Sequence, residues 1–231
     1  MNSTRKPLVV GVVGIIVILA VFAVGTVIMS LLRNPGTETG AISAENAKPA
    51  ATALDGTWVV VQGDAPNLSS AGFTFNEILP SDRRTTSGST TSVKGEAVIA
   101  NDTLTQAQIS VDMTAVATDI EKRDINVQNK IFQTQQYPEA FFEVTEPVKL
   151  GSIPEDGTIG NVTVAGELTI KGQTKKVTSD YQVLRDGEKI SLSTAIEINR
   201  LDFGVETPEF VAAKIDEVGL VKVLLTLEKK Q

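Results

Sequence analysis

Apolar and polar residues alternate along most of the chain from Thr57 onward, which is the pattern of β-strands with one buried face. The clearest case is NVTVAGELTI at residues 161–170, where every second residue is Val, Gly, Leu or Ile and the residues between are mainly polar. Eight further segments show similar alternation and bring the expected number to about nine strands: residues 58–61, 71–75, 93–99, 107–113, 142–148, 177–183, 190–198 and 221–227.

Short turns join these segments. Arg185-Asp186-Gly187-Glu188 is a hairpin turn of the Asp-Gly type. Strands with one apolar and one polar face, joined by hairpins, form an antiparallel sheet with a single interior, and closure of the sheet removes its open edges. The pattern therefore predicts a mainly β fold, an antiparallel β-barrel of eight to nine strands within a domain at residues 54–231.

One charged segment, EKRDINVQNKIF from Glu121, interrupts the strands and has a helical pattern. Thr118 opens an S/T-x-x-E capping box, and Ile125 and Phe132 fall seven residues apart on one helical face. The Tyr-Pro pair at 137–138 ends the segment. We expect one helix over residues 120–132, lying across or against one end of the barrel.

The N-terminal part of the chain has a different character. Residues 8–32 carry no charge and are rich in Val and Ile. As a helix they would extend roughly 37 Å, more than the ~30 Å hydrocarbon core of a bilayer. A cleaved signal peptide is the alternative, but its apolar region is usually about 7 to 15 residues long. We therefore expect an uncleaved transmembrane helix at residues 8–32.

Basic residues Arg5 and Lys6 favour a cytoplasmic N-terminus at residues 1–7, with the rest of the chain outside the cytoplasm. Residues 33–53 contain Pro, Gly and Ala with few bulky apolar side chains, so we expect a flexible linker there.

The composition excludes several classes of function. The chain has no Cys and no His, so thiolate and imidazole metal sites, a Cys nucleophile and a Ser-His-Asp triad are all impossible. Residues 1–54 carry four basic and two acidic side chains, a net charge of +2. Because the whole chain has a net charge of −7, the remaining 177 residues carry −9. That charge repels nucleic-acid phosphates. We expect no enzyme activity, no catalytic residues, no metal, no cofactor and no nucleic-acid partner.

A series of segments, taken in order, resembles the polyisoprenoid-binding YceI-like family across nearly all of residues 54–229. These segments are LDGTW at Leu54, SSAGFTF at Ser69, VKGEAVI at Val93, ISVDMTAVATDIEKRD at Ile109, IFQTQQYPEAFFEV at Ile131, VAGELTIKGQTKKVTSDYQV at Val164 and EINRLDFGV at Glu197.

The resemblance implies an extended lipocalin-like barrel with a helix beside it, in secreted, periplasmic or membrane-anchored bacterial proteins. It also implies a barrel interior that holds an isoprenoid or another amphiphilic lipid, without catalysis. Members of the family often carry histidines after the first and second strands and before the Lys-Pro turn. This chain has none, so any role of those histidines cannot be transferred.

Residues in the inward phase of these segments are the candidates for lipid contact. A dry interior filled by the same side chains is the alternative, since an eight-stranded barrel can be filled or can hold a ligand. The ligand-binding candidates are Phe73, Phe75, Ile109, Val111, Phe132, Phe142, Val144, Leu168, Ile170 and Phe203.

Two arginines lie in segments that match the family. Arg123 is a possible contact for a ligand phosphate or quinone oxygen, although a salt bridge that fixes the helix is the favoured reading. Arg200 is expected to pair locally with Asp202, with Phe203 packed under a turn at Gly204.

Together these features predict a lipid-binding protein anchored in the bacterial cytoplasmic membrane by residues 8–32, single-pass, with its barrel extracytoplasmic. Its partners would be a hydrophobic small molecule, such as an isoprenoid lipid, and the membrane; the sequence does not identify any protein partner. The alternative is an envelope stress or interaction protein with a filled barrel and no ligand.

Overall fold

The computed structural model describes residues 38–79, 82–206 and 214–230 of the 231-residue chain. The expected cytoplasmic N-terminus at residues 1–7 and transmembrane helix at residues 8–32 lie outside the described residues. Within the three described ranges, no helix is both long and apolar enough to cross a membrane.

Antiparallel strands dominate the described part of the chain, and eleven of them form one sheet. Their bounds are β1 (Gly56–Val61), β2 (Ser70–Leu79), β3 (Asp82–Thr90), β4 (Val93–Ala100), β5 (Thr103–Asp112), β6 (Glu139–Val144), β7 (Val148–Lys149), β8 (Ile159–Ile170), β9 (Gln173–Asp186), β10 (Lys189–Asn199) and β11 (Lys214–Lys229).

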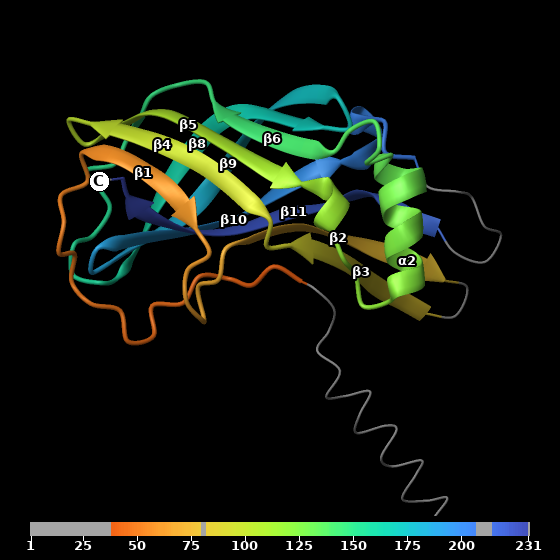
Figure 1. Ribbon diagram of the computed structural model, residues 1–231, viewed down its shortest axis with the longest axis horizontal. Helices are drawn as coiled ribbons and strands as arrows, with labels where there is room; N and C mark the ends of the chain where they lie inside the picture. Colours follow the sequence, from red (N-terminus) through yellow and green to blue (C-terminus); the bar gives the residue numbers. More distant parts are fainter. Residues whose placement is uncertain (1–37, 80–81, 207–213, 231) are drawn as a thin grey trace, which may run out of the picture. The chain divides into compact units, whose positions relative to one another are not determined.

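The sheet closes into a barrel. Eight strands follow one another around it in the order β1, β4, β5, β6, β8, β9, β10 and β11, and β11 pairs again with β1, Trp58 facing Lys229 (Figure 1). Residues 161–170 behave as their alternation predicts, since Val164, Leu168 and Ile170 are buried while Asn161 is exposed. The predicted mainly β antiparallel barrel is therefore confirmed.

Strand β11 is long enough to pair with two different strands, β1 and β2, along the same edge. Residues 226–229 close the barrel onto β1, whereas residues 214–224 pair with β2, and β3 extends the sheet beyond β2. The sequence pattern missed β3, because DRRTTSGST contains no apolar residue. Its backbone pairs with β2 from Asp82 to Thr90. Backbone pairing with the neighbouring strand, and not an apolar face, therefore makes this segment a strand.

The predicted helix over residues 120–132 is present as α2 (Glu121–Asn126), continued without a break by a π-helical turn, η2 (Val127–Phe132). Figure 1 shows it at one end of the barrel, and the Phe132 ring of η2 lies 5.6 Å from the Phe73 ring of β2. The wider π turn brings Val127 and Phe132 onto the buried side, while Ile125 is 57% exposed. Ile125 and Phe132, which the sequence pattern places on one helical face, therefore differ in burial.

The ends of this helix also differ from expectation. Ile120 is the N-cap, and its hydrocarbon side chain cannot accept a hydrogen bond from the first helical N–H groups. The expected capping box at Thr118 does not form, and the hydroxyl of Thr118 donates to Asp124 Oδ1 instead. The helix ends at Gln133, which adopts a left-handed conformation at φ 53°, four residues before the Tyr-Pro pair. Two short 3-10 turns, η1 (Met113–Ala115) and η3 (Arg200–Phe203), complete the described elements.

The described part of the expected flexible linker, residues 38–53, lies against the outside of the barrel, and the compact unit begins at Thr37 and not near Leu54. Ile42 is 8% exposed and packs in a small cluster with Leu184 and Leu224. The prediction of a flexible linker was wrong for these residues, because Ile42 packs against side chains of β9 and β11.

Hydrogen bonds hold the same segment in place. The Ser43 N–H donates to Asn67 Oδ1 at 2.9 Å, and Asn67 Nδ2 donates back to the Ser43 carbonyl at 2.8 Å. Further along, the Ala50 N–H donates to the Glu155 carbonyl at 2.7 Å. Residues 38–53 are therefore held against the barrel by hydrogen bonds although few of them are apolar.

Candidate functional site

The barrel encloses a cavity of about 180 Å³. One water needs only about 10–15 Å³ of such space, so the cavity has room for many carbon-sized groups. None of its 33 lining residues carries a charge, and nearly all are aliphatic or aromatic. A filled barrel, the alternative left open by the sequence, is not what the structure has.

Eight of the ten candidate ligand-binding residues line this cavity: Phe73, Ile109, Val111, Phe132, Phe142, Val144, Leu168 and Ile170. The strands place seven of them on inward-facing positions, and η2 supplies Phe132. The period-two alternation was therefore sufficient to identify which side chains face the interior.

The other two candidates do not line the cavity. Phe75 and Phe203 are 8% and 2% exposed and belong to the hydrophobic cluster that also contains Val127 and Phe132. Phe75 packs over Gly219 on β11, where no side chain competes for the space, and Phe203 is held in the η3 turn. Both are core residues at the helix end of the barrel.

The helix segment contributes directly to the cavity wall. The Phe132 ring lies 5.6 Å from that of Phe73, and both rings line the cavity together with Val116, which is 2% exposed. The charged segment that interrupts the strands in the sequence thus closes part of the interior with its apolar side.

Several lining residues were not predicted. Trp58 is 1% exposed, and its indole Nε1–H donates to the Leu54 carbonyl at 2.7 Å. Leu150 and Ile153 come from the connection before β8, which carries no strand pattern. Tyr181 belongs to the inward phase of β9, and burial raises the pKa of its phenol well above the usual range. The alternation in residues 177–183 was a sufficient signal for Tyr181.

Arg123, the possible headgroup contact, does not line the cavity. Its guanidinium donates to Asp119 Oδ1 at 2.6 Å, and its side chain is 32% exposed. Its neighbour Asp124 accepts from both the N–H and the hydroxyl of Thr118, each at 2.6 Å. These contacts order the turn that leads into α2.

Arg200 also has a structural role, but its hydrogen-bond partners differ from the expected one. It is 6% exposed, and its guanidinium donates to the carbonyls of Val205 at 2.7 Å, Asp216 at 3.2 Å and Ile215 at 3.4 Å. The expected local pairing is therefore made with the Val205 carbonyl and not with Asp202, because the guanidinium turns toward backbone carbonyls. Gly204, at φ 62°, makes the expected turn.

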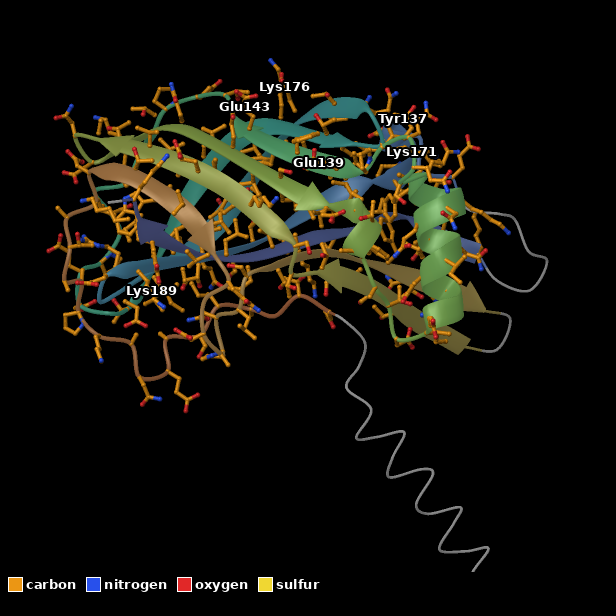
Figure 2. The ribbon with its side chains drawn as sticks, in the orientation of Figure 1. Tyr137, Glu139, Glu143, Lys171, Lys176 and Lys189 are labelled. Carbon is orange, nitrogen blue, oxygen red and sulfur yellow. The ribbon has the colours of Figure 1, made fainter. Side chains whose placement is uncertain are left out.

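Charged groups lie on the outside of the barrel. Figure 2 shows Glu143 and Lys176 directed away from its interior, and both are exposed. In the part of the chain that the structure describes, no three acidic side chains are grouped so as to hold a metal ion. The chemistry of the cavity is thus that of an apolar container.

Comparison with known proteins supplies the family and the fold. Residues 64–227 match the YceI-like domain. BcnA from Burkholderia cenocepacia is similar in structure, with a TM-score of 0.54 and 20% identity over 68% of this chain and 94% of that one. A polyisoprenoid binding domain from Saccharophagus degradans implicated in plant cell wall breakdown has a TM-score of 0.52 and 16% identity, covering 70% of this chain and 98% of that one. At these identities the likeness concerns the fold. Among curated proteins, none matches the chain.

Proposed function

Since this chain belongs to the YceI-like domain family, we propose that its barrel holds a polyisoprenoid or a similar amphiphilic lipid. The observation that carries the proposal is the apolar, uncharged cavity inside the barrel. A polyisoprenoid binding domain among the similar structures supports the same class of ligand.

Hydrophobic burial is strong enough for such a role. Transferring about ten methylenes from water into the cavity is worth roughly 8 kcal/mol, which before ordering costs corresponds to about micromolar affinity. Ordering a flexible chain reduces this gain. A long branched isoprenoid therefore binds better than a short acyl chain, because it buries more surface.

The ligand is held without being converted. The chain has no histidine or cysteine, and none of the described residues that line the cavity has a carboxylate or amine to transfer a proton. Storage, transfer or protection of the lipid are the roles that fit a container of this kind.

The same proposal includes location. The uncharged stretch at residues 8–32 and the basic residues before it favour a single-pass anchor with the barrel outside the cytoplasm. Because the chain has no cysteine, single cysteines can test this. In spheroplasts, a membrane-impermeant maleimide should label Ala195→Cys, on the outer face of β10, and should not label Asn2→Cys. The reverse pattern would contradict the proposed orientation.

The ligand itself can be identified from the purified full-length chain. Native mass spectrometry and solvent extraction are expected to show a co-purifying lipid of several hundred daltons. If protein from several bacterial hosts carried no lipid and took up none from liposomes containing polyprenols, the proposed function would fail.

A further inference from the structure

The cavity wall contains very few polar side-chain groups. Among its 33 lining residues only Trp58 and Tyr181 carry an N–H or O–H in the side chain. The Trp58 N–H is already used by the Leu54 carbonyl. Among the described lining residues, the phenol of Tyr181 is therefore the side-chain donor that is left for a ligand.

No hydrogen bond joins the Tyr181 hydroxyl to any residue in the described ranges, although the residue is only 8% exposed. Desolvation is the cause of its raised pKa, without a contribution from a neighbouring donor or charge. Buried hydroxyls in proteins almost always have a partner, and leaving one without a partner is costly. Tyr181 Oη is not enclosed by protein atoms, since Thr39 Oγ1 is the one buried side-chain atom of the described residues that lacks a partner, so a molecule inside the cavity can supply the missing acceptor.

The position of Tyr181 puts this group in the middle of the barrel. It pairs with Val162 on β8, eight residues from the start of β9 and five from its end. Its ring lies 6.3 Å from that of Phe142, which also lines the cavity. A ligand atom that reaches the hydroxyl must therefore be inside the barrel, and not at its mouth.

The charge of that ligand atom is restricted by the same wall. Among the described residues that line the cavity there is no Lys or Arg, so a phosphate or carboxylate beside them would lose its hydration with no cation to compensate. A neutral oxygen, by contrast, accepts one hydrogen bond from a phenol and otherwise tolerates apolar surroundings.

We propose that the Tyr181 hydroxyl donates a hydrogen bond to a neutral oxygen, such as a ketone or ester carbonyl, of an isoprenoid held inside the barrel. This inference rests on the proposed function and narrows its ligand to isoprenoids that carry an uncharged oxygen within the buried part of the molecule.

Two isoprenoids of nearly the same shape provide the test. Phytone is a branched methyl ketone, and pristane has a methyl branch where phytone has the carbonyl oxygen. The full-length chain and its Tyr181→Phe variant are equilibrated with the same equal mixture of both, delivered from cyclodextrin, and the bound lipids are quantified by gas chromatography. Because one reservoir supplies both proteins, differences in solubility between the lipids cancel.

The bound ratio of phytone to pristane is expected to fall about three- to tenfold in Tyr181→Phe, the effect of one neutral hydrogen bond. Val183→Ala, on the same face of β9, alters the cavity wall without changing its polarity, so it should change the total lipid bound and keep the wild-type ratio. Infrared spectra should show the phytone carbonyl stretch at lower frequency in the wild type than in Tyr181→Phe.

Each failure has a different meaning. If both lipids bind but the ratio and the carbonyl stretch are the same in wild type and Tyr181→Phe, the hydrogen bond is disproved while the lipid container stands. If the wild-type chain binds neither lipid and also carries none after purification, the proposed function falls and this inference with it. Equal unfolding midpoints of the wild type and Tyr181→Phe verify that the comparison is between folded proteins.

Discussion

The ring of Phe142 occupies the space that a side chain at Gly166 would need. A β-carbon built at Gly166 on β8 would lie 2.5 Å from Cζ of Phe142 and 2.6 Å from the Glu143 carbonyl oxygen on β6. The two strands pair there, with Phe142 opposite Leu168 and Val144 opposite Gly166. The absent side chain thus lets the Phe142 ring approach the backbone of β8 closely.

Gly166→Ala should therefore push the Phe142 ring and the β6 backbone away. We expect a loss of about 1–3 kcal/mol in the free energy of unfolding, as for other overpacked interiors, measured by urea denaturation. Gly151→Ala is the matched control, because nothing lies within 4 Å of a β-carbon there. Similar losses for both variants would show that the effect comes from glycine itself and not from the ring.

Ala107→Leu should reduce lipid binding by filling the cavity. Ala107 lines it from β5, and three added carbons occupy space that a ligand would otherwise use. Since the added side chain enters open space, the free energy of unfolding should stay the same or rise. The amount of co-purifying lipid, measured by extraction and mass spectrometry, should fall severalfold. Ala195→Leu, on the exposed face of β10, should retain the wild-type lipid content.

Asp124→Asn should loosen α2. Asp124 accepts two hydrogen bonds from the buried Thr118, and charged acceptors of this kind contribute about 1.5–3 kcal/mol. We expect faster amide exchange in residues 121–126 and faster release of bound lipid, because the same helical segment covers the cavity through Phe132.

The neighbouring pair offers the control for that variant. Asp119→Asn removes the more exposed contact with Arg123, which should be worth only about 0.2–1 kcal/mol. Equal amide exchange in the two variants would show that the Thr118 contact does not hold the helix.

Arg200→Lys should destabilise the barrel although it preserves the charge. The guanidinium reaches the three carbonyls from three different nitrogens, and the single nitrogen of a lysine cannot occupy all three positions, so at least one acceptor loses its partner. We expect a loss of about 2 kcal/mol or more by denaturant unfolding. Arg123→Lys, at a more exposed site, should change stability by less than about 1 kcal/mol. An unchanged free energy of unfolding in Arg200→Lys would contradict this account.

Stability should decrease in acid partly through Asp55. The N–H groups of Asp102 and Asn101 hydrogen-bond its carboxylate and lower its pKa below the ordinary 3.8. A carboxyl with a depressed pKa contributes stability above the unfolded value, and the contribution is lost as pH falls through the folded value. Asp55→Asn should therefore show a shallower loss of melting temperature below pH 3.8 than the wild type. An identical slope would exclude this contribution.

Local sequence was sufficient to predict the barrel and the helix. Side chains alternate across a strand with a period of two and recur along a helix with a period near 3.6, whatever their neighbours are. For that reason the inward phase of β8 and the position of α2 with η2 could be predicted without the structure. The same signal identified Phe73, Ile109 and Phe142 as interior residues.

Several features depend on tertiary structure and could not be predicted from the periodicity of the sequence. Strand β3 has no apolar face, and residues 38–53 have little apolar content, so both are ordered by pairing and hydrogen bonds with segments distant in sequence. Phe75 and Phe203 are apolar and buried like their neighbours, yet they fall outside the cavity because of where Gly219 and the η3 turn place them.

Alternation alone assigns the interior face of each strand, because the direction of a side chain follows from the local backbone. It does not say how far facing side chains reach across the barrel, since that distance depends on strand number, tilt and stagger. The open cavity and the unpartnered hydroxyl of Tyr181 inside it therefore became visible only when all the strands were in place.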